Sequence, residues 1–99
     1  IKFLNRIIKA IGMKAMYGPT ASYCKMNGNR GVTAFAIIET SHIAMHIWDE
    51  VNPALVQLDV YTCGPFEPQS VLDIIQELKP NKVEYKYLDR EKGFTELTI

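Results

Sequence analysis

Two stretches of this chain carry an apolar residue at every second position, and only a short turn containing Pro53 separates them. The alternating apolar residues are Ile43, Met45 and Ile47 in segment 41–50, and Val56, Leu58 and Val60 in segment 55–63. Because successive side chains of a strand point to opposite faces, a period of two predicts strands that bury one face each. The chain therefore has to build its fold around a sheet that is covered on one side.

Two further segments carry apolar residues in a single stripe at helical spacing. In 1–12 the stripe consists of Phe3, Leu4, Ile7, Ile8 and Ile11, and Gly12 suits a C-terminal stop. In 69–79 the stripe consists of Val71, Leu72, Ile75 and Leu78, with Pro68 in the first turn and Pro80 at the end. We expect one helix before the strands and one helix after the central pair.

The remaining segments also favour strands. The dipeptide Gly18-Pro19 predicts an interrupted or edge strand over 14–25, and the Gly- and Asn-rich residues 26–31 predict a loop. Segment 32–40 is rich in small and branched apolar residues, which favours a strand buried on both faces, although periodicity alone leaves a helix open. Segment 82–90 alternates through Val83, Tyr85 and Tyr87, and 91–99 is expected to be a tail or a short strand.

These elements indicate one α+β domain over residues 1–99, in which two helices lie on one face of a mainly antiparallel sheet. The other face would carry the polar side of the last central strand, namely Gln57, Asp59, Tyr61 and Cys63. A half-polar second face of this kind is either solvated, or it lines a site or a partner sheet.

Composition excludes several classes of function. The chain has 11 Lys and Arg against 11 Asp and Glu, and a neutral chain argues against general nucleic-acid binding. No apolar run approaches the 18 residues of a membrane span. Two cysteines are too few for a disulfide framework or a four-thiolate zinc site. The neutral composition and the absence of a visible targeting signal favour the cytoplasm.

Chemically useful side chains gather in one short stretch. They are Ser41, His42, His46, Trp48 and Glu50, followed later by Cys63. On a strand the two histidines would stand about 13 Å apart, so the spacing gives no metal site. A Ser-His-Asp hydrolase is possible in composition, but the G-x-S-x-G elbow is absent. Taken singly, each of these residues is more often structural than catalytic.

The combination is more specific. "TSHIAMHIWDE" at 40–50 and "LDVYTCG" at 58–64 resemble the prokaryotic, pyruvoyl-dependent S-adenosylmethionine decarboxylase family. That family has a processing serine followed by His, a second His five positions after the serine, and a "TCG" strand end about twenty residues later. "GVT" at 31–33 is similar to a Gly-Val-Ser/Thr stretch that lies before the processing serine in the family.

The resemblance implies that the proenzyme cuts itself between Thr40 and Ser41. The Ser41 hydroxyl would attack the Thr40 carbonyl, and residue 41 would become a pyruvoyl group, leaving a β chain 1–40 and an α chain 41–99. It implies His46 as the base of this processing and Thr33 as a hydrogen-bond donor to the intermediate. The pyruvoyl group forms a Schiff base with the substrate amine and accepts electrons as CO₂ leaves.

In the same family, the Cys that matches Cys63 returns a proton to the substrate. Glu50 would accept hydrogen bonds from ribose hydroxyls, and Trp48 would pack near the nucleoside and its sulfonium. The resemblance also implies a homodimer that stacks two sheets face to face in four layers (αββα), and a product that feeds spermidine synthesis.

Three features depart from the family pattern. Thr40 stands where many members have Glu, the usual strand before the first helix is not visible, and the loop 25–31 has no Phe for the adenine. Two alternatives to S-adenosylmethionine decarboxylation therefore stay open. One is a pyruvoyl-dependent decarboxylase of a free amino acid such as arginine or ornithine, and the other is an unprocessed, non-catalytic relative.

Overall fold

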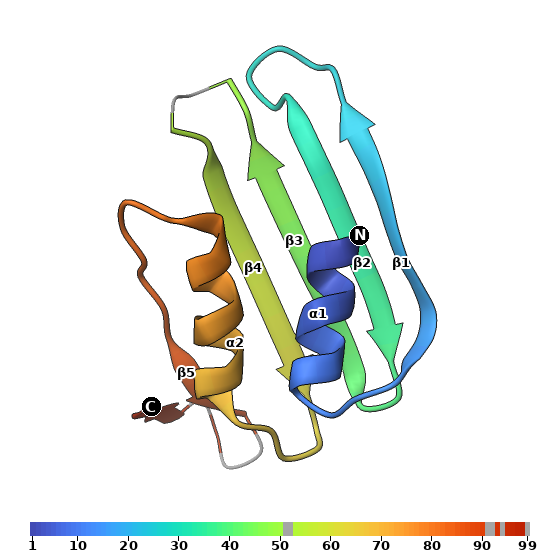
Figure 1. Ribbon diagram of the computed structural model, residues 1–99, viewed down its shortest axis with the longest axis vertical. Coiled ribbons are helices and arrows are strands. Elements are labelled where there is room, and N and C mark those ends of the chain that lie inside the picture. Colours follow the sequence, from blue (N-terminus) through green and yellow to red (C-terminus); the bar gives the residue numbers. More distant parts are fainter. Residues whose placement is uncertain (51–52, 91–92, 94, 99) are drawn as a thin grey trace.

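The structure is a computed structural model that describes residues 1–50, 53–90, 93 and 95–98. Along these residues it has the elements α1 (Lys2–Ala10), β1 (Ala15–Cys24), β2 (Gly31–Ile38), β3 (Ser41–Trp48), β4 (Leu55–Thr62), α2 (Pro68–Ile75), a 3₁₀ turn η1 (Gln76–Leu78), β5 (Tyr87–Asp89) and β6 (Thr95–Leu97). The strands β1 to β4 form one sheet in chain order, and both helices cover the same face of it (Figure 1). The predicted α+β class and the two helices on one face are confirmed.

Every pairing in the main sheet is antiparallel, and the register decides which side chains meet. Thr33 of β2 stands opposite His46 of β3, and Ile38 stands opposite Ser41. Ser41 in turn stands opposite Thr62 of β4. As predicted, β1 is an edge strand with irregular pairing, because its register shifts between Tyr17 and Thr20 around Gly18-Pro19.

The core lies between the helices and the covered face of the sheet. The α1 stripe is buried as predicted through Leu4, Ile7, Ile8 and Ile11. These residues pack against Ala34, Ala36, Ile38, Ile43 and Met45 of β2 and β3, and against Val71 of α2. An ion pair between Arg6 of α1 and Glu77 of η1 joins the two helical segments at the surface. The sheet is therefore held from one side, and its other face is left open.

The prediction that 32–40 is buried on both faces is wrong. Burial along β2 alternates, and Phe35 and Ile37 remain 38% and 44% exposed on the open face. An apolar run shows that a strand avoids polar residues, but it does not show whether a second layer covers it within the same chain. The open face is consequently more apolar than the polar side chains of β4 suggested.

Two predictions near the C-terminus are also corrected. The strand expected over 82–90 is reduced to β5, which pairs with β6 instead of joining the main sheet, so Val83 and Tyr85 precede it in irregular chain. Leu78 is 48% exposed, because the α-helix gives way to the 3₁₀ turn at Gln76 and the helical spacing is lost. Ile74 packs against the core beside Ile75.

Among the described residues, no helix has the length and apolar character that crossing a membrane would require.

Candidate active site

The segment with the predicted cleavage bond is a tight hairpin between β2 and β3. Ile38 and Ser41 form its closing pair, so Glu39 and Thr40 are the only residues in the turn. Ser41 has a φ of 150°, a conformation that residues with a side chain rarely adopt. The backbone is therefore strained at the residue that follows the Thr40 carbonyl.

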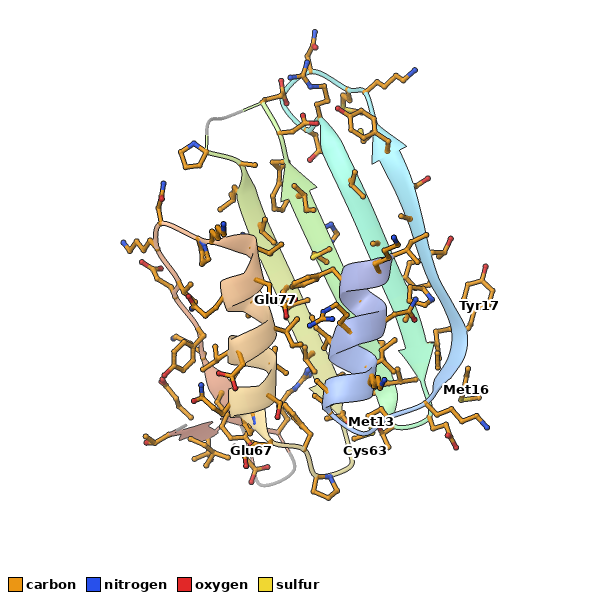
Figure 2. All side chains as sticks on the ribbon, viewed as in Figure 1. Met13, Met16, Tyr17, Cys63, Glu67 and Glu77 are labelled. Atoms are coloured by element: carbon orange, nitrogen blue, oxygen red, sulfur yellow. The ribbon has the colours of Figure 1, made fainter. Side chains whose placement is uncertain are left out.

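The Thr40 carbonyl is hydrogen-bonded from the end of β4. The backbone N–H of Cys63 donates to it at 2.9 Å, which polarises the carbonyl carbon toward a nucleophile. The Cys63 side chain is an exposed free thiol directly after β4. Figure 2 shows Cys63 and Met13 at this end of the sheet, below the C-terminal end of α1. One short region thus holds the predicted scissile carbonyl, the predicted nucleophile and the predicted thiol acid.

The imidazole nearest to the Ser41 hydroxyl belongs to its own neighbour. Nδ1 of His42 lies 3.5 Å from Oγ of Ser41, at the outer limit of a hydrogen bond. The His42 ring meets the Tyr61 ring edge-on at 5.4 Å, and the Arg90 guanidinium lies 4.8 Å from the centre of the Tyr61 ring. Sequence reasoning placed His42 in the polar cluster but gave it no part in the chemistry.

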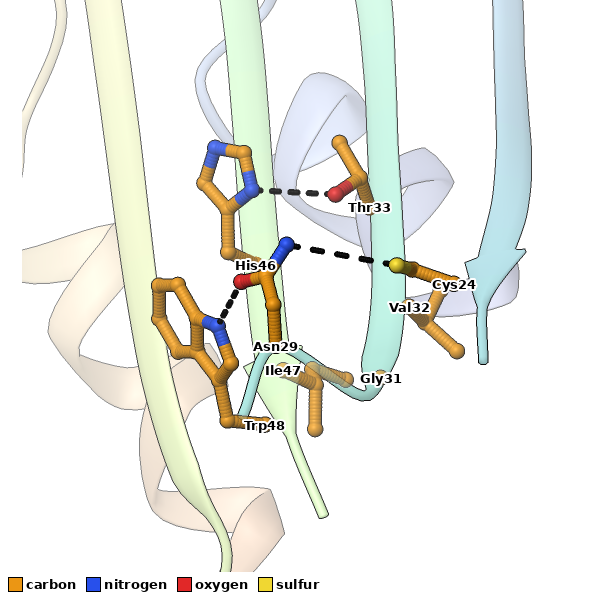
Figure 3. A pocket seen from close by; sticks show the side chains of 8 residues that line it. All are labelled: Cys24, Asn29, Gly31, Val32, Thr33, His46, Ile47 and Trp48. Carbon is orange, nitrogen blue, oxygen red and sulfur yellow. Dashed lines mark hydrogen bonds between the residues drawn. The ribbon is translucent and has the colours of Figure 1, made fainter. Parts of the chain in front are cut away.

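A second group of functional side chains lies at the opposite end of β3. Oγ1 of Thr33 and Nδ1 of His46 are 3.1 Å apart across the β2–β3 pair. The indole of Trp48 stacks beside the His46 ring at 5.7 Å, and its N–H donates to Oδ1 of Asn29 at 2.9 Å. Figure 3 shows these side chains around a pocket of about 250 Å³, with Cys24 on its far side. The spacing of Asn29 gave no signal of this contact, because the 25–30 loop folds back over the sheet.

Two carboxylates fasten that loop. Glu50 accepts hydrogen bonds from the backbone N–H groups of Arg30 at 2.9 Å and Gly28 at 3.1 Å, which lower its pKa. Asp49 accepts from Tyr23 at 2.6 Å and from the Arg30 guanidinium at 3.0 Å, and these bonds lower its pKa as well. Since a carboxylate has about four acceptor positions, Glu50 keeps capacity for ligand hydroxyls beside its structural role.

The comparisons with known proteins now bear on this arrangement. A family model described as S-adenosylmethionine decarboxylase matches residues 1–91. The chain belongs to the S-adenosylmethionine decarboxylase family. No solved structure gives a significant match.

Curated relatives carry the same family name. The S-adenosylmethionine decarboxylase proenzyme of Pyrobaculum islandicum is 45% identical over 91 residues, which are 90% of this chain and 63% of the relative. The proenzymes of Pyrobaculum arsenaticum and Pyrobaculum neutrophilum are 37% and 40% identical, with 91% and 90% of this chain covered. In both cases 64% of the relative is covered. The chain thus spans slightly less than two thirds of these relatives' length.

The structure divides the predicted site residues into two groups that lie at opposite ends of β3. The structure brings Thr40, Ser41 and Cys63 together, and separately brings Thr33 to His46. Ser41 and His46 are five residues apart on one strand, and a rise of about 3.3 Å per residue separates them by about 16 Å. Within one chain, the predicted base and the predicted nucleophile are therefore not in contact. No cluster of three or more potential metal ligands occurs among the described residues.

Proposed function

We propose that this chain is a self-processing decarboxylase that cuts its backbone between Thr40 and Ser41 and acts on S-adenosylmethionine. The observation that carries the proposal is the geometry of the cleavage hairpin. The Thr40 carbonyl accepts a hydrogen bond from the Cys63 amide, and the next residue, Ser41, holds a φ of 150°. A backbone conformation of this kind costs about 1–3 kcal/mol, which cleavage would release.

The cleavage begins with an N-to-O acyl shift. The Ser41 Oγ attacks the Thr40 carbonyl carbon, the negative charge goes to the carbonyl oxygen, and the Cys63 N–H donates to it. The bond from the Thr40 carbonyl carbon to the Ser41 nitrogen then breaks, and the hydroxyl proton ends on that nitrogen. Loss of the Ser41 Cα proton expels the Thr40 carboxylate, and hydrolysis of the resulting dehydroalanine releases ammonia.

The pyruvoyl group fits this position. Once the peptide bond is cut, residue 41 has no φ angle and its Cα becomes planar, so the strain at 150° disappears. When present, the group supplies an electron-accepting ketone for the loss of CO₂. The exposed Cys63 thiol follows β4, and its own backbone N–H binds the Thr40 carbonyl, so it would return a proton to the substrate carbon. Trp48 and Glu50 would hold the nucleoside, with the Glu50 carboxylate kept anionic by its lowered pKa.

His46 acts in this proposal across a dimer interface. Ala44 lies midway between Ser41 and His46 along β3 and shares the open face with His46. A two-fold axis that runs between the two sheets, parallel to them and perpendicular to β3, and passes over Ala44 would lay His46 and Thr33 of one chain over the cleavage turn of the partner subunit. The small side chain at position 44 lets two sheets approach. This is the face-to-face αββα dimer that the family resemblance implies.

The open face supports such a partner. Phe35, Ile37 and Tyr61 are 38%, 44% and 41% exposed there, and burial against a second sheet would remove their apolar area from water. A chain of 99 residues gains much from this burial, since small domains bury a modest share of their own surface.

Complementation between two inactive variants tests the shared site. Ser41→Ala and His46→Ala, each expressed alone, should stay intact. Co-expressed, they should give a fraction of mixed dimers in which the His46→Ala chain is cut, because its Ser41 meets an intact His46 of the partner subunit. No cleavage on co-expression would contradict the shared site. Cleavage of His46→Ala expressed alone would place the base elsewhere, with His42 the first residue to test.

The substrate is tested by CO₂ release. The names of the relatives favour S-adenosylmethionine over a free amino acid, and we expect CO₂ from carboxyl-labelled S-adenosylmethionine but not from arginine or ornithine. Release of CO₂ from arginine or ornithine alone would contradict the proposed substrate, but it would not contradict the proposed self-cleavage. The decarboxylated product would serve spermidine synthesis, and we expect the enzyme to act in the cytoplasm.

A further inference from the structure

We propose that Thr62 is a positioning residue for self-cleavage, whose hydroxyl holds Thr40 so that the scissile carbonyl stays on the Cys63 amide. The inference rests on the proposed cleavage between Thr40 and Ser41. It extends that proposal to a residue that touches none of the reacting atoms.

A directed chain of hydrogen bonds fixes the Thr40 side chain. The Gly64 N–H donates to Oγ1 of Thr62 at 3.1 Å, and the Thr62 hydroxyl donates to Oγ1 of Thr40 at 2.6 Å. The Thr40 hydroxyl then donates to Sδ of Met13 at 3.1 Å. Each hydroxyl has one proton to give, so this order uses every donor once. The Gly64 carbonyl, at 3.3 Å from the Thr62 hydroxyl, is the longer of its two acceptors.

Packing closes the other side of Thr40. A Cβ added to Gly64 would lie 3.0 Å from the Thr40 methyl carbon and 3.5 Å from the terminal methyl of Met13. The Thr40 side chain is thus bounded by its hydroxyl contacts on one side and by the Gly64 backbone on the other. Rotation about its side-chain bonds would break the hydrogen bonds or collide with residue 64.

Holding this side chain also holds the adjacent peptide group. The carbonyl of the same residue accepts from the Cys63 N–H, so the side chain and the carbonyl of Thr40 are both tied to residues 62–64. The Cys63 N–H stabilises the reaction only if it points at the Thr40 oxygen, where negative charge develops as Ser41 attacks. Small displacements of a hydrogen-bond donor in such a position slow a reaction strongly. Position 40 is one of the departures from the family pattern, and these contacts describe how a Thr can be held there.

The test compares three variants of the full chain. Thr62→Val removes the hydroxyl at nearly constant shape, Thr62→Ser keeps it, and Thr98→Val removes an exposed hydroxyl after β6 as a control. Intact mass against time gives the rate of self-cleavage for each. We expect Thr62→Val to be slower by about tenfold, and Thr62→Ser and Thr98→Val to remain within about threefold of wild type.

Further readouts separate positioning from folding and from acid–base chemistry. The pH profile of cleavage should keep its shape in Thr62→Val, and turnover per pyruvoyl group should match wild type once cleavage is complete. In the uncleavable Ser41→Ala background, Thr62→Val should accelerate hydrogen exchange at the Cys63 amide. Gly64→Ala, which pushes on Thr40 from the other side, should slow cleavage as well.

The results that overturn the inference differ from those that overturn the cleavage itself. The positioning role of the Thr62 hydroxyl would be wrong if Thr62→Val cut at the wild-type rate, or if Thr62→Ser cut as slowly as Thr62→Val. Neither result would contradict self-cleavage itself. Unchanged exchange at the Cys63 amide in a folded Thr62→Val chain would also contradict the positioning role alone. A wild-type chain that never cuts would overturn the cleavage proposal, and the positioning role with it.

Discussion

The two ends of β3 carry different groups of chemically useful side chains, although a single strand joins them. At its start, Ser41 follows a two-residue turn and has a φ of 150°, and the preceding carbonyl is bound by the Cys63 amide. At its other end, His46 and Thr33 form a hydrogen-bonded cross-strand pair beside Trp48 and a pocket of about 250 Å³. Strain and a bound carbonyl mark the first end, whereas a cavity and an imidazole mark the second.

Within one chain, the residues of the proposed site therefore lie in two separate groups at opposite ends of β3. About 16 Å of strand separates the proposed nucleophile from the proposed base, and a sheet held on one side by helices cannot fold over to bring its ends together. In a dimer whose two β3 strands run in opposite directions, the turn end of one β3 would lie over the pocket end of the other.

The largest effect is expected from Ser41→Ala, which removes the proposed nucleophile. The chain should remain full length on prolonged incubation and show no decarboxylation. Ser41→Cys is the matched variant, because a thiol can still attack the Thr40 carbonyl and should give slow cleavage. Two fragments from Ser41→Ala, seen by intact mass, would show that another group cuts the chain.

Cys63→Ala should separate the two reactions of the turn end. Alanine keeps the backbone N–H that binds the Thr40 carbonyl, so cleavage should proceed close to the wild-type rate. Turnover of the cleaved protein should fall by about 10²–10⁴, the usual contribution of a proton donor. Steady-state CO₂ release per pyruvoyl group measures this, and wild-type turnover would exclude the thiol from the mechanism.

Thr33→Val acts at the pocket end and should have a smaller effect. It removes the hydroxyl that lies 3.1 Å from Nδ1 of His46, so the imidazole loses its fixed orientation. Cleavage should slow by about tenfold, and Thr33→Ser should restore it. An equal loss in Thr33→Val and Thr33→Ser would indicate a packing role for the methyl group instead.

The smallest effect is a pH dependence of the pocket loop. Hydrogen bonds in the folded chain lower the pKa values of Asp49 and Glu50, so their stabilisation is present above the unfolded carboxyl pKa and is lost as pH falls through the folded values. Trp48, the single tryptophan of the chain, donates to Asn29 of this loop, and its fluorescence should change as the pH falls below the ordinary carboxyl pKa range. Glu50→Gln should remove part of that acid transition, and an identical titration would show that Glu50 does not fasten the loop.

The fold was largely predictable because its periodicities are local. Alternation in β3 and β4 and the stripe of α1 each follow from spacing within one element, and burial agrees with them at Ile43, Met45 and Ile7. The errors arose where an element depends on what lies outside it. Phe35 and Ile37 are apolar on a face that none of the described elements covers, and 82–86 alternates without a described strand to pair with.

The site was predictable only in part. The separation of Ser41 from His46 follows from strand rise alone, whereas the contact of Cys63 with Thr40 requires the β3–β4 register. The chain of hydrogen bonds through Thr62 and Met13 depends on a turn length and a linker path that no spacing rule gives. The Asn29 contact likewise depends on how one loop closes over the sheet.

The central claim is that this chain breaks its own backbone, and the intact mass of freshly purified protein under denaturing conditions tests it most directly. The account predicts two fragments, ending at Thr40 and beginning at residue 41, with the second blocked to Edman degradation. One species of full mass that persists through long incubation of the folded protein would contradict it.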